Sequence, residues 1–574
     1  MAKKAPRLCQ LDTPFEKDTQ YSWNEYPRPQ MKRDSFISLC GEWKLSVKKN
    51  DTATLVGNIT VPYPPESRIS GIERNLAPDE RWVYSKKFVF DEKDNKGRVL
   101  LHFGAVDQMC RVWLNGQHIG EHTGGYLPFC FDVTQYIKYG ENSLCVEVCD
   151  ETNIDFSFGK QKYDRGGMWY TPVSGIWQPV WIESVAENHI RNLRITPALD
   201  SITIETEGGC SEKTVVIDTA QGKITHSFAG DKTTIKIDNP INWTPENPHL
   251  YNFTITSGED SIESYFALRT VTIEKVKGQS YICLNGKPYF FHGLLDQGYY
   301  SDGIYTPATP YGFVWDILEM KKQGFNMLRK HIKIEPDLFY YYCDKYGMVV
   351  FQDMINAGKY NYIIDTVLPT IGFKRGFYHT PTQQRRTFFE NECRQVCDLL
   401  YNHPSVCYYT IFNEGWGQYE SDRIYRELKQ YESTRVWDAT SGWFKCKDSD
   451  VDSEHIYFRK IKLKARSERP LVLSEFGGYS YKVAGHSFNL DENYGYKTFD
   501  SAESLTQGLY DLYATDIVNC INNGLNATVL TQVSDVEDET NGIVTYDRKV
   551  IKTDSTKMQE MAKMIFDAFD KKVK

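Results

Sequence analysis

Two short apolar runs that each end in a carboxylate place the strongest limit on how this sequence can fold. Residues 408–412 are β-branched and aromatic, and the run stops at Glu414, which glycine follows. Residues 471–473 repeat this pattern and lead to Glu475 and two further glycines. Apolar runs of this kind are typical of strands buried in a parallel sheet. Because such sheets carry their chemistry at the carboxyl ends of strands, we expect both carboxylates at one rim.

The 574 residues are too many for one hydrophobic core. From about residue 43 the sequence alternates short strands with turns, including the hairpin signal Asn115-Gly116, which indicates a β-sandwich. A second all-β stretch has the size of an immunoglobulin-like domain. Strands then alternate with helices, approaching eight units in roughly 300 residues, the size of a TIM barrel. We therefore predict domains at 1–185, 186–273 and 274–574.

Composition narrows the class of partner and the compartment. The formal net charge is -9, which argues against nucleic acid or an anionic membrane as a partner. The first residues carry positive charge with no apolar segment behind them, and no run approaches the roughly twenty apolar residues of a membrane span. The 14 cysteines are scattered without a CxxC pattern, which suggests reduced thiols. We expect a cytoplasmic protein.

The two strand-end motifs, Asn413-Glu414 and Ser474-Glu475-Phe476-Gly477, resemble the acid/base and nucleophile signatures of glycoside hydrolase family 2. This family contains β-galactosidases, β-glucuronidases and β-mannosidases. The resemblance covers nearly the whole chain, because residues 124–129, 166–170 and 243–251 also resemble family segments. It implies an N-terminal jelly-roll β-sandwich that binds sugar, an immunoglobulin-like β-sandwich and a C-terminal TIM (β/α)8 barrel that is catalytic.

The resemblance also implies a reaction and roles for residues. In a retaining glycosidase the two carboxyl groups lie about 5 Å apart, one protonated to release the leaving oxygen and one ionised to attack the anomeric carbon. By resemblance Glu414 is the acid/base, Glu475 the nucleophile, and Asn413 the partner of the sugar 2-hydroxyl. A single strand-end Glu is more often part of a salt bridge, and the two motifs together reverse that expectation.

Other strand-end residues are candidates for binding the sugar. His331 matches a family position that contacts the sugar, although a histidine there is equally often structural. Tyr457 is our choice for the tyrosine that hydrogen-bonds the nucleophile, with a packed core tyrosine as the alternative, and Arg329 could orient Glu475. The predicted substrate-binding residues are Asn413, His331, Tyr457, Asp353, Asp296 and Trp416, and Gln297 is a similar candidate.

Departures from well-known members bear on the substrate. Glucuronidases of the family carry an Asn-x-Lys motif, where this chain has Glu539 and Asn541, so a β-glucuronidase is disfavoured. Gly167 replaces an acidic sodium-binding residue of large β-galactosidases. We expect a β-galactosidase because this activity is frequent in the family. β-Glucosidase, β-xylosidase and α-L-arabinopyranosidase are the alternatives. The acidic residues Asp535, Glu537 and Asp538 either contact sugar hydroxyls or form a solvated loop.

We expect a retaining, exo-acting enzyme that needs no redox cofactor and acts on a terminal sugar of an oligosaccharide or glycoside. Family analogy allows a bound Mg, Ca or Na ion, but no ligand cluster in the sequence fixes a metal site. The sequence leaves room for a homo-oligomer. A non-catalytic carbohydrate-binding protein on the same scaffold is the remote alternative. It predicts loss of one carboxylate, and both are present.

Overall fold

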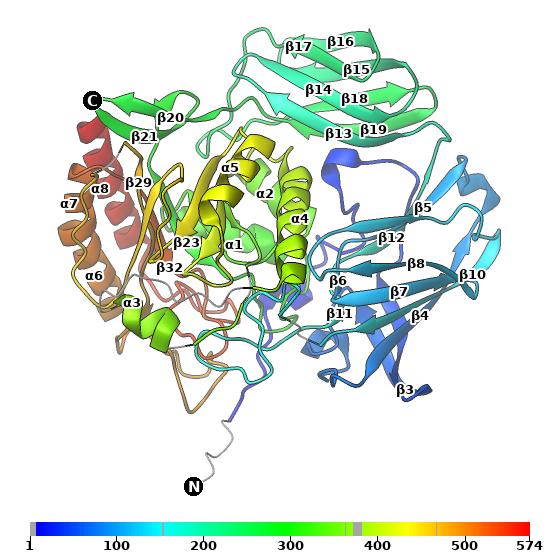
Figure 1. Ribbon diagram of the computed structural model, residues 1–574, viewed down its shortest axis with the longest axis horizontal. Helices are drawn as coiled ribbons and strands as arrows, with labels where there is room; N and C mark the ends of the chain where they lie inside the picture. Colours follow the sequence, from blue (N-terminus) through cyan, green and yellow to red (C-terminus); the bar gives the residue numbers. More distant parts are fainter. Residues whose placement is uncertain (1–6, 152–153, 357, 362, 371–380, 467) are drawn as a thin grey trace.

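The computed structural model describes residues 7–151, 154–356, 358–361, 363–370, 381–466 and 468–574. Figure 1 shows a β-rich region in blue and cyan, a second β-rich region in cyan and green above it, and a barrel with helices in green to red. The predicted fold class, two β-sandwiches followed by an α/β barrel, is confirmed. Among the described residues, no helix has the length and apolar character needed to cross a membrane.

The first region packs a six-stranded antiparallel sheet of order β3-β2-β4-β10-β7-β8 with a four-stranded sheet of order β1-β12-β5-β9. Large buried side chains, including Trp43, Trp82 and Tyr84, fill the core. The predicted turn Asn115-Gly116 joins β7 and β8 with positive φ at both residues, 53° and 81°, as a tight hairpin requires. The strands are β1 Phe36–Ser38, β2 Gly41–Lys49, β3 Thr52–Val61, β4 Arg81–Phe90, β5 Arg98–Phe103, β6 Val106–Asp107, β7 Met109–Leu114, β8 Gln117–Thr123, β9 Phe129–Asp132, β10 Gly140–Cys149, β11 Gly175–Ile176 and β12 Val180–Val185.

The second region is a smaller sandwich of sheets β13-β14-β17 and β16-β15-β18-β19. Isoleucine, valine and aromatic side chains alternate into its core, as expected when each sheet has one face in water. Its strands are β13 Ile190–Pro197, β14 Ser201–Gly208, β15 Glu212–Thr219, β16 Gly222–Ala229, β17 Lys232–Lys236, β18 Tyr251–Ser257 and β19 Asp260–Phe266.

The third region is built on eight parallel strands of order β27-β26-β25-β24-β23-β32-β29-β28, and contacts between β27 and β28 close the barrel. Most of these strands are buried along their whole length, which explains their continuous apolar runs. The strands are β23 Phe291–Asp296, β24 Met327–Lys330, β25 Val349–Asp353, β26 Val406–Asn413, β27 Val436–Ser441, β28 Asp452–Ile456, β29 Leu471–Gly477 and β32 Leu525–Thr531, with short pieces β20 Val271–Val276, β21 Gln279–Leu284, β22 Lys287–Pro288, β30 Tyr479–Ser480 and β31 Lys497–Thr498.

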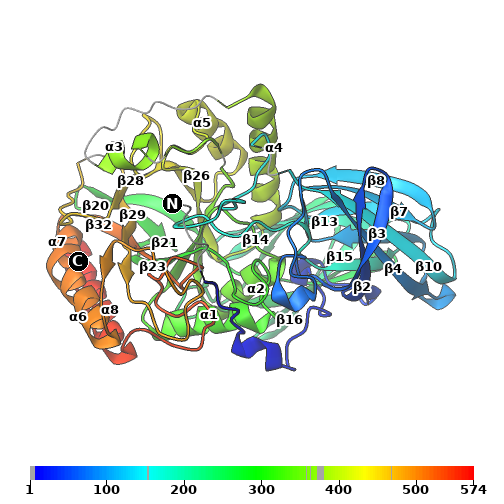
Figure 2. The same ribbon diagram turned by 90° about the horizontal axis from the view of Figure 1, so that it is seen from below.

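Helices cover the outside of the barrel (Figure 2). The Thr382 side chain caps the long helix before β26 by accepting from the Arg385 N–H at 3.0 Å. The helix predicted near residues 502–522 contains a π-helical turn, η6 Tyr513–Ile517, and the C-terminal helix packs on it. The α-helices are α1 Tyr311–Lys322, α2 Asp337–Tyr346, α3 Leu368–Thr370, α4 Gln383–Leu400, α5 Ser421–Tyr431, α6 Ala502–Leu512, α7 Val518–Asn522 and α8 Ser555–Val573; the shorter turns are η1 Pro14–Lys17, η2 Pro29–Met31, η3 Arg68–Ser70, η4 Glu92–Asp94 and η5 Ile363–Val367.

Candidate active site

The two strand-end glutamates lie together at the carboxyl rim of the barrel. β26 leads directly into Glu414, and β29 carries Glu475 near its end. One side-chain oxygen of each carboxylate lies within 4.8 Å of the other, and both residues are buried, at 8% and 5% exposure. This separation agrees with the spacing of about 5 Å in retaining glycosidases and is well below the roughly 6.5–9.5 Å of inverting ones.

Glu414 sits on a sharp backbone turn. Its φ is 52°, a left-handed conformation that costs a non-glycine residue of order 1–3 kcal/mol. The Glu414 N–H donates to the Ser441 carbonyl at 3.0 Å, which ties the turn to β27. At Gly415, φ is 83° and a Cβ atom would lie 2.5 Å from the Phe444 ring. The glycine after the carboxylate is therefore required by both backbone angle and space.

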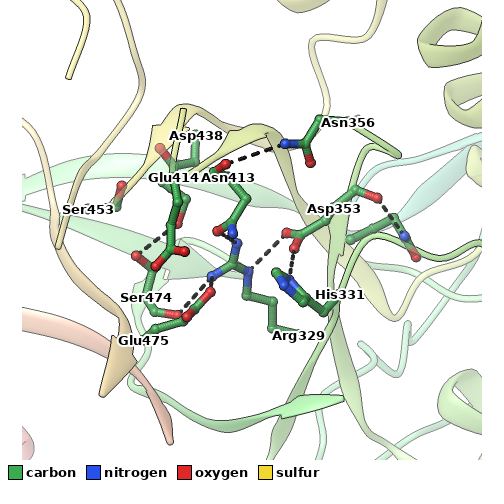
Figure 3. A network of polar contacts seen from close by, with 12 residues as sticks. Arg329, His331, Asp353, Asn356, Asn413, Glu414, Asp438, Ser453, Ser474 and Glu475 are labelled. Carbon is green, nitrogen blue, oxygen red and sulfur yellow. Dashed lines mark hydrogen bonds and ion pairs between the residues drawn. The ribbon is translucent and has the colours of Figure 1, made fainter. Parts of the chain in front are cut away.

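Arg329, at the end of β24, connects the polar groups of the rim (Figure 3). Its guanidinium donates to Asp353 Oδ1, to Glu475 Oε1 and to Asn413 Oδ1, each at 2.9 Å. The side chain is 1% exposed, so these charge-assisted bonds lie out of water. The contact between Arg329 and Glu475 agrees with the expectation that Arg329 orients this carboxylate.

Glu475 is surrounded by groups that favour its ionised form. Tyr457 Oη donates to Glu475 Oε2 at 2.6 Å, as the sequence predicts. Burial alone raises the pKa of Glu475, but the charges of His455 and Arg329 outweigh it and lower that pKa below the ordinary value. A carboxylate in these surroundings is ionised at neutral pH and can act as a nucleophile.

Glu414 has a different partner, His455, for which the sequence predicted no role. His455 Nδ1 lies 2.8 Å from Glu414 Oε1, and His455 Nε2 lies 2.9 Å from Ser441 Oγ. Gly442 makes room for the ring, since a Cβ there would be 3.0 Å from Nδ1. The signal was present, because His455 precedes Tyr457 by two residues and alternate residues of a strand share one face.

His331 and Asp353 form a buried pair beside Arg329. His331 Nδ1 lies 2.6 Å from Asp353 Oδ2, and the other Asp353 oxygen accepts from Arg329. Burial, and next the charge of Lys160, lower the pKa of His331 to about 4. Burial would raise the pKa of Asp353, but Arg329 and His331 lower it. Asp353 is thus ionised and holds its neighbours, while the neutral His331 ring leaves Nε2 for another partner.

The side-chain amide of Asn413 uses its oxygen in a hydrogen bond within the protein and leaves its nitrogen as a donor. Its Oδ1 accepts from Arg329, and its Nδ2 makes no hydrogen bond within the described chain. An amide fixed in this way presents a donor next to both carboxylates. Asp296, by contrast, is engaged by protein groups, because its oxygens contact Lys330 Nζ at 2.7 Å and the Gly298 N–H at 2.9 Å. A sugar contact by Asp296 stays a prediction.

Aromatic side chains join the barrel rim to the first domain. The Trp416 ring stacks on Trp169 at 5.0 Å between centroids and 18° between planes. Trp416 is 4% exposed, and its indole N–H has no hydrogen-bond partner among the described residues. Tyr170 Oη donates to Glu539 Oε2. Residues 166–170 therefore reach the rim, in agreement with the segment that they resemble.

The acidic residues after β32 are buried, which corrects the reading of them as a solvated loop. Their exposures are 1% for Asp535, 3% for Glu537 and 6% for Asp538. Lys552 Nζ donates to Asp535 at 2.6 Å, and Arg165 pairs with Glu537 and Asp538 at 3.2 Å each. Sequence reasoning could not show this, because the compensating cations lie elsewhere in the chain. Sugar contacts by these residues stay a prediction.

Glu414, His455 and Glu475 are the group in the described chain whose ligand atoms are close enough to hold a metal ion, within 4.8 Å of one another. Both Glu475 oxygens already accept from protein donors, one from Arg329 and one from Tyr457. A cation there would compete with the Arg329 guanidinium. The donor set therefore fits acid–base and nucleophilic chemistry better than a metal site.

Comparison with known proteins agrees with this picture. Models of three domains match in order: "Glycosyl hydrolases family 2, sugar binding domain" at residues 11–184, "Glycosyl hydrolases family 2" at 188–269, and "Glycosyl hydrolases family 2, TIM barrel domain" at 275–565. Solved structures of similar fold include a β-glucuronidase from an uncultured Clostridium (TM-score 0.75, 18% identity, 93% of this chain and 99% of that one). A β-galacturonidase from Eisenbergiella tayi aligns with a TM-score of 0.65, 18% identity, and coverage of 96% and 98%.

Curated relatives are distant in sequence. A β-galactosidase of Thermoanaerobacter pseudethanolicus is 25% identical over 71% of this chain and 56% of its own length. A putative β-glucuronidase of Formosa agariphila is 27% identical over 64% of this chain and 34% of its own length. The chain thus spans about half or less of the length of these relatives. With all three of its domains matched in order, the chain belongs to glycoside hydrolase family 2.

Proposed function

We propose that the chain is a retaining, exo-acting β-glycosidase that hydrolyses terminal β-linked sugars, with Glu414 as acid/base and Glu475 as nucleophile. The observation that carries this proposal is the approach of the two buried carboxylates to within 4.8 Å at one barrel rim. A separation this small leaves no room for the water that an inverting enzyme places between its carboxylates.

The geometry suits a double displacement. Glu475 attacks the anomeric carbon as the bond to the leaving oxygen breaks, and Glu414 gives its proton to that oxygen. Glu414 then removes a proton from water, which attacks the same carbon and releases Glu475. Arg329 and Tyr457 keep Glu475 ionised and aimed, and His455 orients Glu414. The free Nδ2 of Asn413 donates to the sugar 2-hydroxyl.

The contacts between the first domain and the rim support exo action. Trp169 stacks on Trp416, two residues after the acid/base, and Tyr170 contacts the last barrel loop at Glu539. Closing one end of the rim in this manner favours a single terminal sugar over an internal segment of a polymer. Substrate contacts are assigned to Asn413, His331, Tyr457 and Trp416, while Asp353 holds its neighbours.

For the terminal sugar we propose β-galactose. The relatives named β-galactosidase, from Thermoanaerobacter pseudethanolicus and Priestia megaterium, are 25% and 22% identical to this chain. Glu539 is buried at the rim, where a uronate carboxylate would meet a second acid, which disfavours a β-glucuronidase. β-Glucosidase, β-xylosidase and α-L-arabinopyranosidase are the alternatives. A non-catalytic carbohydrate-binding protein would not need both carboxylates.

We propose that hydrolysis needs no metal ion and no redox cofactor, with any Mg, Ca or Na ion acting through structure alone. The roles in the double displacement are filled by side chains, and the Arg329 guanidinium supplies the positive charge next to Glu475. Incubation with a chelator followed by desalting is expected to leave the rate unchanged. A rate that falls and returns only with added Mg²⁺ or Ca²⁺ would contradict this proposal.

A panel of nitrophenyl glycosides tests the proposed function. We expect one β-sugar to be cleaved, Glu475→Ala to be inactive, and azide to restore turnover of Glu414→Ala with a β-glycosyl azide as the product. Glu454→Gln, on the neighbouring strand β28 and paired with Lys445, is the matched control and keeps its activity. Full activity in Glu475→Ala would place the nucleophile elsewhere.

A further inference from the structure

Lys160 is a buried cation with no ion-pair partner among the described residues. The residue is 8% exposed, and its ammonium forms no hydrogen bond or ion pair with any described residue. Its nearest aromatic rings are those of Trp416, 5.5 Å from Nζ, and Tyr170, 6.0 Å away. The face of an aromatic ring attracts a cation, but it offers no lone pair that could accept a conventional hydrogen bond from the ammonium. Because burying an unpaired ammonium is costly, its donors are suited to a ligand.

The backbone on both sides of Lys160 is firmly held. Gly159 has a φ of 61°, and a Cβ there would lie 2.6 Å from Tyr126 Oη and 3.1 Å from the Ile332 carbonyl. Gln161 Nε2 donates to Tyr126 and Tyr305 at 3.2 Å each. The Lys160 carbonyl itself accepts from the Tyr170 N–H at 3.0 Å. The backbone that carries the ammonium is therefore fixed before any ligand arrives, which reduces the entropic cost of binding.

Glu539 presents an acceptor to the same part of the rim. Its Oε2 accepts from both Tyr170 Oη and Gln532 Nε2, whereas Oε1 accepts from no described residue. Burial raises the pKa of Glu539, the charge of Lys160 opposes that change, and the charge of Glu475 adds to it. The charges of Lys160 and Glu475 therefore both act on Glu539. No ion pair within 4.0 Å joins Lys160 to Glu539.

We propose that Lys160 and Glu539 bind one hydroxyl of the terminal sugar between them and thereby select that sugar. The Lys160 ammonium donates to the hydroxyl oxygen, and Glu539 Oε1 accepts the hydroxyl proton. This inference rests on the proposed function, because it places the anomeric carbon at Glu475 and the 2-hydroxyl at Asn413. The bound hydroxyl then belongs to the far side of the ring, at C4 or C6.

The pair favours a neutral sugar over a uronate. A hydroxyl satisfies both groups because it accepts one hydrogen bond and donates another. A carboxylate in its place could accept from Lys160 but would face the Glu539 oxygen, and two like charges at close range repel. A site built to hydrogen-bond a hydroxyl rejects an analogue that lacks it far more strongly than an apolar pocket can, because its buried polar groups are then left unpaired.

Lys160→Met tests this proposal, with Lys44→Met as the matched control, since Lys44 is an exposed lysine of β2 in the same domain. The substrates are nitrophenyl β-D-galactoside, its 4-deoxy and 6-deoxy analogues, and the β-D-galacturonide. We expect Lys160→Met to lower kcat/KM for the galactoside about 10²-fold. On the one deoxy sugar that lacks the bound hydroxyl, Lys160→Met should lower kcat/KM by no more than about threefold relative to the wild type. The deoxy sugar that behaves in this way identifies the bound hydroxyl as the one at C4 or the one at C6.

Three outcomes would overturn it: full activity of Lys160→Met on every sugar, an equal loss on all sugars including both deoxy analogues, or a selective loss on the galacturonide. Glu539→Gln should show the same dependence on the deoxy position. If the wild type cleaves none of the sugars, the proposed function fails by itself. Calorimetric binding of free galactose then still tests Lys160, because an affinity that Lys160→Met leaves unchanged contradicts the contact.

Discussion

The barrel rim and the first domain contribute to the site in different ways. The barrel supplies Arg329, Glu414 and Glu475 at strand ends, where each group is bonded to others from neighbouring strands. The first domain supplies Lys160, Trp169 and Tyr170 on the chain between β10 and β11, and these meet the barrel through ring stacking and one side-chain hydrogen bond. The barrel residues form one network of charges around the two carboxylates, whereas Lys160, Trp169 and Tyr170 form separate contacts.

On the proposed function, this difference would separate chemistry from sugar recognition. Within a buried charge network, removing one partner leaves the others unpaired, so several groups lose their position and ionisation state together. A loop that makes separate contacts loses only the contact that is removed. We therefore expect substitutions at the barrel rim to act on kcat and on the pH profile, and substitutions in the first-domain loop to act on KM and on sugar preference.

Arg329→Met should give the largest effect. It removes the fork that holds Asp353, Asn413 and Glu475, and we expect kcat/KM to fall about 10³-fold. The pKa of Glu475 is depressed in the folded protein, and Arg329 is one of the charges that lower it. Without Arg329 this pKa rises, a smaller fraction of Glu475 is ionised at acid pH, and the acid limb of the kcat/KM profile moves to higher pH.

Arg329→Lys is the control for that experiment, because it keeps the charge but not the planar fork. Relative to Arg329→Met, it should return the acid limb of the kcat/KM profile most of the way to its wild-type pH but recover little of kcat. An acid limb that is unchanged in Arg329→Met would show that Arg329 does not govern the ionisation of Glu475. Circular dichroism of each variant establishes that the barrel is folded.

His455→Ala should give a smaller effect that depends on the leaving group. Loss of the contact between His455 Nδ1 and Glu414 Oε1 frees the acid/base to rotate away from the leaving oxygen. We expect about a 10²-fold loss with alkyl glycosides, which need a proton, and about tenfold or less with dinitrophenyl glycosides, which do not. An equal loss with both leaving groups would mean that His455 acts through Glu475, which lies 3.5 Å from the same nitrogen.

Trp169→Ala tests the first-domain side. Removing this ring takes away the stacking partner of Trp416, and we expect KM to rise about tenfold while kcat changes less than about threefold. Trp113→Ala is the matched control, because Trp113 is a half-buried tryptophan of β7 whose ring contacts His118. A fall in kcat with unchanged KM would place the first-domain loop within the catalytic network and remove the distinction drawn above.

The two carboxylates at one rim were readable from the sequence because strand, carboxylate and glycine are local signals. The buried run of β26, the positive φ at Glu414 and the contact of Gly415 with Phe444 are the physical reasons for that order of residues. The family resemblance led to Tyr457, and the position of Arg329 at a strand end suggested its link to Glu475; both contacts are present in the structure.

Ion-pair and packing partners that lie far apart in the sequence could not be predicted from it. Asp296 and Asp353 occupy equivalent strand ends, yet Asp296 pairs with Lys330 while Asp353 pairs with Arg329, and nothing local distinguishes them. Lys160 in a Gly-Lys-Gln segment reads as a surface residue, and its burial depends on how the first domain packs on the barrel. The charges that neutralise the loop after β32 likewise come from other parts of the chain.

The smallest effect is expected at Gly116→Ala, in the hairpin between β7 and β8. Its φ of 81° is strained for alanine, although a Cβ there would meet no atom within 4 Å. The cost is therefore conformational, about 1 kcal/mol in the free energy of unfolding, measured as a lower midpoint in a urea titration. Because this turn belongs to the sandwich and not to the segment between β10 and β11, kcat, KM and sugar preference should all equal those of the wild type. A rise in KM like that of Trp169→Ala would show that the whole first domain, and not its loop alone, sets sugar binding.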